Sequence, residues 1–118
     1  MIKEGAQPPR RVRHLIKQVL KSLSEAHSYS IVHRDLQPAN IMVVDLHGET
    51  DFVKVLDFGI AKLLDHEDED NEEDPLTSAG MLVGTMRYMA PEQITGERLG
   101  AHTDLYALGL ILIELLTN

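Results

Sequence analysis

Three short stretches of the sequence group side chains that can do chemistry. The first, HRDLQPAN, runs from His33 to Asn40 and places an aspartate and an asparagine in one short segment. The second, DFG, begins at Asp57, and the third, GTMRYMAPE, ends at Glu92. Carboxylates can accept a proton from a hydroxyl group, and carboxylate and amide oxygens suit a magnesium ion. Thiol chemistry is excluded because the sequence contains no cysteine.

The first stretch has the form H-R-D-L-x-x-x-N and resembles the catalytic loop of protein kinases. The D-F-G and A-P-E sequences follow it in the order that this family shows, which makes coincidence a poor explanation. The resemblance implies a serine/threonine protein kinase, which transfers the γ-phosphoryl group of ATP to a protein substrate with the help of Mg²⁺. The segments GIAKLL and GTMRYMAPEQ are most similar to bacterial enzymes of this type.

The resemblance also implies roles for individual residues. Asp35 would orient the attacking hydroxyl and accept its proton, and Asn40 and Asp57 would hold the magnesium ion on the ATP phosphates. Gly59 would let the chain turn after Asp57. In the family, the aspartate that matches Asp104 holds the backbone of the catalytic loop. The residues implied to be structural are His33, Phe58, Gly59, Glu92 and Asp104.

Several hydroxyl groups lie in the implied activation segment between D-F-G and A-P-E. A phosphate on Thr77 or Ser78 could pair with Arg34 and order this segment. An unmodified polar loop is the alternative. Thr85 is expected to contact the catalytic aspartate rather than to receive phosphate.

The sequence departs from the kinase pattern at Gln37. Serine/threonine kinases usually have a lysine two residues after the catalytic aspartate, where it neutralises charge on the transferring phosphate. Loss of one such electrostatic contact commonly lowers a rate by about 10² to 10³. The site is therefore expected either to act weakly or to have lost its activity. Ser30 is a milder departure, because relatives often have glycine at this helix end, where positive φ is favoured.

The resemblance covers about residues 10 to 117, which correspond to less than half of a kinase domain. No G-x-G-x-x-G loop and no V-A-I-K-like lysine precede the catalytic loop. The expectation is a partial kinase domain over residues 1–118, with negligible phosphoryl transfer by this chain alone. Two alternatives stay open. One is a catalytically inactive, pseudokinase-like binding module that pairs with another kinase chain, and the other is a truncated gene product.

The elements that must position these motifs can be predicted from the spacing of apolar residues. Pro8 and Pro9 precede a helical pattern that ends near His27. The runs 41–44 and 52–56 predict a small antiparallel ribbon connected by residues 45–51. Residues 105–116 are apolar nearly all round, as in a helix buried within a larger protein. The fold class expected is α+β, mainly α, similar to part of a kinase C-lobe. The apolar stripe of the first helix comprises Val12, Leu15, Ile16, Val19, Leu20, Leu23 and Ala26.

The net charge of -8 is unevenly distributed along the chain. Residues 1–64 hold 9 basic and 7 acidic side chains, whereas residues 65–118 hold 2 and 12. This distribution argues against a nucleic-acid partner, whose affinity would rest on lysine and arginine. The acidic run DHEDEDNEED at 65–74 is expected to form a solvated loop. It has no glycine and so does not fit an EF-hand calcium loop.

The histidines and the apolar segments exclude two further classes. None of the six histidines forms an H-x-x-x-H pair, which argues against a metal hydrolase. The expected metal is magnesium, bound together with ATP. The first residues lack the apolar core of a signal peptide, and the apolar stretch 105–113 is too short to span a bilayer. The expected location is the cytoplasm.

Overall fold

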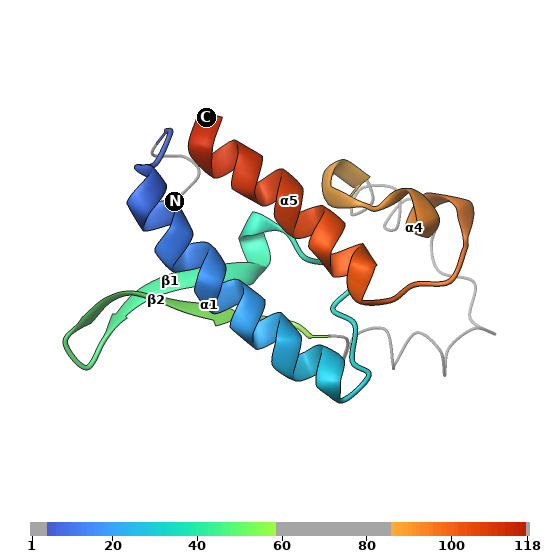
Figure 1. Cartoon of the computed structure of the whole chain (residues 1–118), viewed down its shortest axis with the longest axis horizontal. Helices are drawn as coiled ribbons and strands as arrows, with labels where there is room; N and C mark the ends of the chain where they lie inside the picture. Colours follow the sequence, from blue (N-terminus) through green and yellow to red (C-terminus); the bar gives the residue numbers. More distant parts are fainter. Residues whose placement is uncertain (1–4, 59–85, 118) are drawn as a thin grey trace, which may run out of the picture.

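The described part of the chain consists of helices and one small sheet. The structure, a computed structural model, describes residues 5–58 and 86–117. In these residues helix α1 packs against both the two-stranded antiparallel sheet and helix α5 (Figure 1). This arrangement confirms the predicted combination of helices with a small antiparallel ribbon. In chain order the elements are α1 (Pro9–Ser28), the 3₁₀ turn η2 (Pro38–Asn40), β1 (Ile41–Leu46), β2 (Glu49–Val55), the 3₁₀ turn η3 (Met86–Tyr88), α4 (Pro91–Thr95) and α5 (Ala101–Thr117).

Helix α1 begins at Pro9, because a proline is tolerated in the first turn, where its missing N–H would have no partner. Its apolar stripe is narrower than predicted. Leu20 is 41% exposed, because a step of one residue from the buried Val19 rotates its side chain by about 100° away from the core. At the other end, Ser30 has φ 58°, as predicted for this position. The side chains of α1 that are buried are Val12, Leu15, Val19 and Leu23.

Strands β1 and β2 pair over a longer stretch than predicted. Ile41 lies opposite Val55, and the pairing continues to Leu46 opposite Glu49. The predicted connection over residues 45–51 was therefore wrong, since only His47 and Gly48 separate the strands. Both of these residues have positive φ, 51° and 80°, which suits the two-residue turns of β-hairpins. The two strands thus extend beyond the apolar runs 41–44 and 52–56 from which they were predicted.

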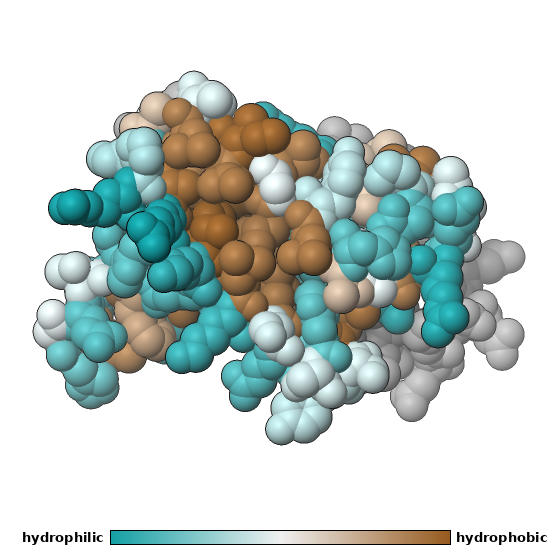
Figure 2. Space-filling view, viewed as in Figure 1, coloured by the Kyte–Doolittle hydropathy of each residue, from teal (hydrophilic) through white to brown (hydrophobic). Residues whose placement is uncertain are grey.

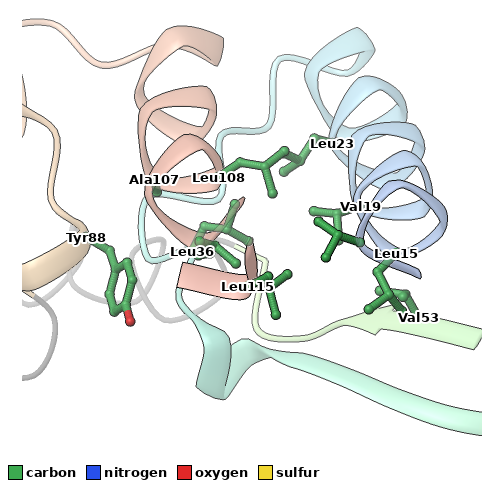
Figure 3. Close-up of a cluster of buried hydrophobic side chains, with 11 residues drawn as sticks. Leu15, Val19, Leu23, Leu36, Val53, Tyr88, Ala107, Leu108 and Leu115 are labelled. Atoms are coloured by element: carbon green, nitrogen blue, oxygen red, sulfur yellow. The ribbon is translucent and has the colours of Figure 1, made fainter. Parts of the chain in front are cut away.

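The hydrophobic core lies between α1, α5 and the ribbon, and Figure 3 shows its side chains converging there. Leu36 comes from the HRDLQPAN stretch and Tyr88 from the stretch that ends in A-P-E, so the core fixes both stretches to the helices. Each fully buried aliphatic side chain contributes about 1.5 to 3 kcal/mol relative to exposure. The buried apolar residues are Val12, Leu15, Val19, Leu23, Leu36, Val53, Tyr88, Ala107, Leu108, Ile111 and Leu115.

Helix α5 is buried on one face only. It begins at Ala101, four residues before the predicted start, and its apolar outer face carries Leu105, Ile113 and Leu116, all exposed. The helix is thus apolar nearly all round, as predicted, but this chain covers only one of its faces. Figure 2 shows apolar side chains gathered over the adjoining surfaces of α1 and α5. Among the residues that the structure describes, no helix has the length and apolarity needed to cross a membrane.

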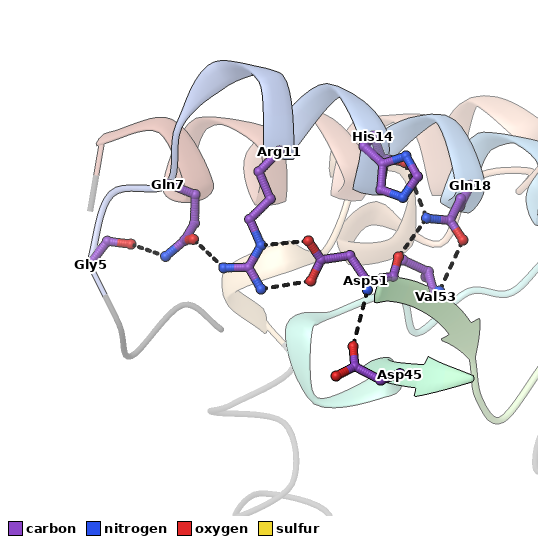
Figure 4. A network of polar contacts seen from close by, with 8 residues as sticks. All are labelled: Gly5, Gln7, Arg11, His14, Gln18, Asp45, Asp51 and Val53. Atoms are coloured by element: carbon purple, nitrogen blue, oxygen red, sulfur yellow. Dashed lines mark hydrogen bonds and ion pairs between the residues drawn. The ribbon is translucent and has the colours of Figure 1, made fainter. Parts of the chain in front are cut away.

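A polar network joins the amino-terminal half of α1 to β2 (Figure 4). The Arg11 guanidinium donates two hydrogen bonds to the Asp51 carboxylate, at 3.0 and 2.9 Å. Gln18 donates to the Asp51 carbonyl at 2.8 Å and accepts from the Val53 N–H at 3.0 Å. The hydrogen bond from Arg11 lowers the pKa of Asp51 and outweighs the opposing effect of burial.

Loss of this ion pair should change how stability depends on pH. The pKa of Asp51 is lower in the folded than in the unfolded chain. The ion pair with Arg11 therefore stabilises the fold at pH values above the pKa that Asp51 has in the unfolded chain. This stabilisation is lost as the pH falls through the pKa that Asp51 has in the folded chain. Between pH 5 and 2 the unfolding free energy of the native chain should fall by about 0.5 to 1 kcal/mol more than that of Asp51→Asn, measured by urea denaturation. Equal slopes for the two proteins would contradict this prediction, and Glu25→Gln, which removes an exposed carboxylate of α1, is the control.

Candidate active site

The buried carboxylate of Asp104 anchors the HRDLQPAN loop. Asp104 lies in the first turn of α5 and is 1% exposed. Its Oδ2 accepts the His33 backbone N–H at 2.8 Å, and its Oδ1 accepts that of Arg34 at 2.9 Å. Oδ2 also lies 2.7 Å from Nε2 of His27, at the end of α1. One side chain therefore connects α5, α1 and the loop, and His27 is a contact that the motifs did not indicate.

The His33 ring connects the loop to the segment after β2. Its Nδ1 accepts the Asp35 backbone N–H at 3.2 Å, so we assign the ring hydrogen to Nε2, which donates to the Leu56 carbonyl at 2.7 Å. The ring also packs edge-on against Phe58, with ring centroids 4.8 Å apart. These contacts hold the DFG stretch beside the HRDLQPAN loop.

Three polar side chains of the loop contact one another around Asp35. Nδ2 of Asn40 donates to the Asp35 carbonyl at 2.7 Å and lies 3.5 Å from its Oδ2. Nε2 of Gln37 donates to Oδ1 of Asp35 at 3.3 Å. Asn40 is buried, whereas Asp35 and Gln37 are partly exposed. Because the Asn40 nitrogen faces Asp35, its amide oxygen remains available to a ligand.

Asp57 lies just beyond the end of β2, with an exposed side chain and a left-handed backbone, φ 59°. Few non-glycine residues adopt this conformation, and they concentrate at functional sites. In the described part of the chain, no group of three histidine or acidic side chains is placed to hold a metal ion. The predicted roles of Gly59, Thr77, Ser78 and Thr85, and of the acidic run 65–74, lie outside the described residues.

The stretch that ends in A-P-E contacts α5 through two glutamates. Oε1 of Glu92 accepts a hydrogen bond from the hydroxyl of buried Thr103 at 3.0 Å. The Tyr88 hydroxyl donates to Oε1 of Glu114 at 2.7 Å, and the Arg87 guanidinium lies 3.1 Å from the same atom. Burial, together with the bond to Glu114, raises the pKa of Tyr88 to about 12. The phenol therefore stays protonated and keeps its hydrogen bond throughout the physiological pH range.

Comparison with known proteins agrees with this arrangement. The sequence pattern of the protein kinase domain matches residues 1–118. The chain belongs to the protein kinase family. It is 51% identical over 108 residues to the serine/threonine-protein kinase pkn3 of Myxococcus xanthus, and 52% identical over 104 residues to Pkn1 of the same organism. It is 40% identical over 115 residues to PknB of Mycolicibacterium smegmatis.

These three matches cover 92%, 88% and 98% of this chain, but only 19%, 14% and 17% of the respective relatives. The chain thus spans less than a fifth of the length of each of these kinases. The resemblance to bacterial serine/threonine kinases, first drawn from the three motifs, is confirmed.

Removal of the anchoring carboxylate should be costly. Asp104→Ala leaves the N–H groups of His33 and Arg34 without acceptors in a buried place, so we expect a loss of about 3 kcal/mol or more in unfolding free energy. Urea denaturation measures this loss. Asp45→Ala, which removes an exposed carboxylate from β1, is the matched control and should cost about 0.5 kcal/mol or less. Similar losses in the two variants would contradict the anchoring role of Asp104.

Proposed function

We propose that this chain provides the catalytic loop and part of the C-lobe of a serine/threonine protein kinase. The reaction is transfer of the γ-phosphoryl group of ATP to a serine or threonine hydroxyl of a protein. The observation that carries this proposal is the hydrogen-bonded set of Asp35 and Asn40 in a loop whose backbone is held by Asp104. Phosphoryl transfer is catalysed mainly by positioning and electrostatic stabilisation, and a prearranged loop provides the positioning.

Asp35 is the residue that receives the substrate hydroxyl. The hydroxyl hydrogen-bonds to the partly exposed carboxylate, which directs its oxygen at the phosphorus. As the new O–P bond forms and the bond to ADP breaks, the hydroxyl proton passes to Asp35. Gln37 and Asn40 each lie near a different oxygen of this carboxylate, so they fix its orientation before substrate arrives.

Asn40 and Asp57 are the residues that would hold magnesium. Mg²⁺ prefers hard oxygen ligands and usually takes one or two from the protein, with the remainder from phosphates and water. The free amide oxygen of Asn40 and the exposed carboxylate of Asp57 fit this requirement. When bound, the ion neutralises charge that develops on the phosphates.

Activity should depend on Asp35 and be limited by Gln37. The test grafts the matching stretch of this chain into the full-length M. xanthus kinase pkn3 and measures transfer of labelled phosphate from ATP to a basic protein. Asp35→Asn should lower kcat by about 10² to 10⁴, because it removes the proton acceptor. Gln37→Lys should raise kcat by about 10² to 10³, because it restores a positive charge near the transferring phosphate.

Asp45→Asn in the same graft removes an exposed carboxylate outside the loop and should leave kcat unchanged. Full activity in Asp35→Asn would overturn the proposed reaction. The proposed reaction would also be overturned if the graft were inactive both with Gln37 and with Gln37→Lys.

The apolar outer face of α5 favours a second candidate, a binding module that pairs with another kinase chain. Leu105, Ile113 and Leu116 are all exposed on this helix, and Gly109 adds no side chain between them. The surface continues onto α1 (Figure 2). Contiguous exposed apolar surface of this kind commonly marks an interaction site.

Sedimentation analysis of the chain, alone and mixed with full-length pkn3, tests this second candidate. The expected result is association that Ile113→Lys weakens by about tenfold or more, because a charge would be buried in an apolar contact. Tyr29→Lys, at an exposed position directly after the end of α1, is the control and should leave association unchanged. A chain that stays monomeric and does not bind the kinase would exclude this candidate.

A further inference from the structure

The backbone of Arg34 is held at both of its polar groups by different elements. Its N–H donates to Asp104 of α5 at 2.9 Å. Its carbonyl accepts a hydrogen bond of 2.6 Å from Nε2 of Gln93, in α4. The other end of the same Gln93 amide, Oε1, accepts the N–H of Ala90 at 3.0 Å. Gln93 therefore bridges the backbone of the A-P-E sequence and the backbone of the catalytic loop.

We infer that Gln93 is a positioning residue that couples the A-P-E sequence to Asp35, an inference that rests on the proposed kinase function. The Arg34 carbonyl and the Asp35 N–H belong to one planar peptide group. Gln93 holds the carbonyl side of this group, and Nδ1 of His33 accepts from its N–H side at 3.2 Å. Together the two contacts fix the peptide plane from which the Asp35 side chain projects.

Arg34 needs such restraint because its own conformation is unfavourable. It has φ 71°, in the left-handed region that side-chain-bearing residues rarely adopt. Such a conformation persists only where the surrounding structure enforces it. The cavity beside these residues, lined by Arg34, Asp35 and Gln93 among others, measures about 10 Å³, which leaves barely enough room for one water molecule.

Only an amide side chain can make both contacts. Gln93 accepts from Ala90 and donates to Arg34, whereas glutamate in its place could accept but not donate. A shift of the A-P-E backbone moves Gln93 and, through it, the Arg34 carbonyl. The position of this segment is thus transmitted to the proton-accepting residue over two hydrogen bonds.

Gln93→Glu separates the two contacts, because it keeps an acceptor for Ala90 and places a carboxylate against the Arg34 carbonyl. Gln18 provides a matched control, since its amide likewise joins a backbone carbonyl and a backbone N–H, those of Asp51 and Val53, away from the loop (Figure 4). In the chain itself, amide hydrogen exchange at Arg34 and Asp35 should become about tenfold faster in Gln93→Glu. Gln18→Glu should leave both rates unchanged.

The kinetic readout uses the graft in pkn3. Gln93→Glu and the uncharged Gln93→Met should each lower kcat by about tenfold or more with little change in KM for ATP, because the nucleotide contacts are intact. Native exchange rates in Gln93→Glu, or faster exchange without a fall in kcat, would overturn the positioning role. If the graft is inactive both with Gln37 and with Gln37→Lys, the proposed reaction fails, whereas the exchange rates still decide whether Gln93 restrains the loop.

Discussion

The buried carboxylate of Asp104 is the contact on which the rest of the site depends. Transfer of a charged group out of water costs several kcal/mol, and it is tolerated only where hydrogen bonds replace the lost solvent. Asp104 receives them from the backbone of His33 and Arg34 and from the ring of His27. The loop therefore cannot be placed without α5, which carries the acceptor, and α1, which carries one of its partners. This requirement makes the position of the loop depend on two long helices.

The loop in turn positions the residues that follow it. His33 reaches the Leu56 carbonyl and the Phe58 ring, and the Leu56 N–H donates to the Asn40 carbonyl at 2.8 Å. The ribbon between these points returns the chain to the loop, so the DFG stretch lies beside HRDLQPAN although many residues separate them. Apolar packing of Leu36 against the helices completes the restraint (Figure 3). Polar and apolar contacts thus act on the same short segment.

Sequence alone predicted the parts of this arrangement that have a local signal. The extent of α1 followed from its prolines and apolar spacing, and Asp35 and Asn40 were paired by a motif. The hairpin was predicted, but its turn was placed over residues 45–51 instead of His47 and Gly48, because the polar residues around the turn lack the alternation that marks a strand. Periodicity showed that α5 is apolar on nearly every side, but it could not tell which side this chain covers, since an apolar surface looks the same whether or not another element packs on it.

His27 and Gln93 could not have been found from local sequence. Each acts on a partner far along the chain, Asp104 for His27 and Arg34 for Gln93, and neither belongs to the H-R-D, D-F-G or A-P-E sequences. Asp104 was indicated only by resemblance to the family. Such tertiary contacts emerge once α1, α4 and α5 are packed, because their geometry depends on how the helices cross rather than on neighbouring residues.

Asp104 holds the HRDLQPAN loop in place before any nucleotide or metal binds. The most direct measurement is the NMR scalar coupling across hydrogen bonds, from the backbone nitrogens of His33 and Arg34 to the carboxyl carbon of Asp104. Both couplings should be present in the chain free of ATP and Mg²⁺. Absence of both couplings in a folded chain, or their appearance only after ATP and Mg²⁺ are added, would contradict it.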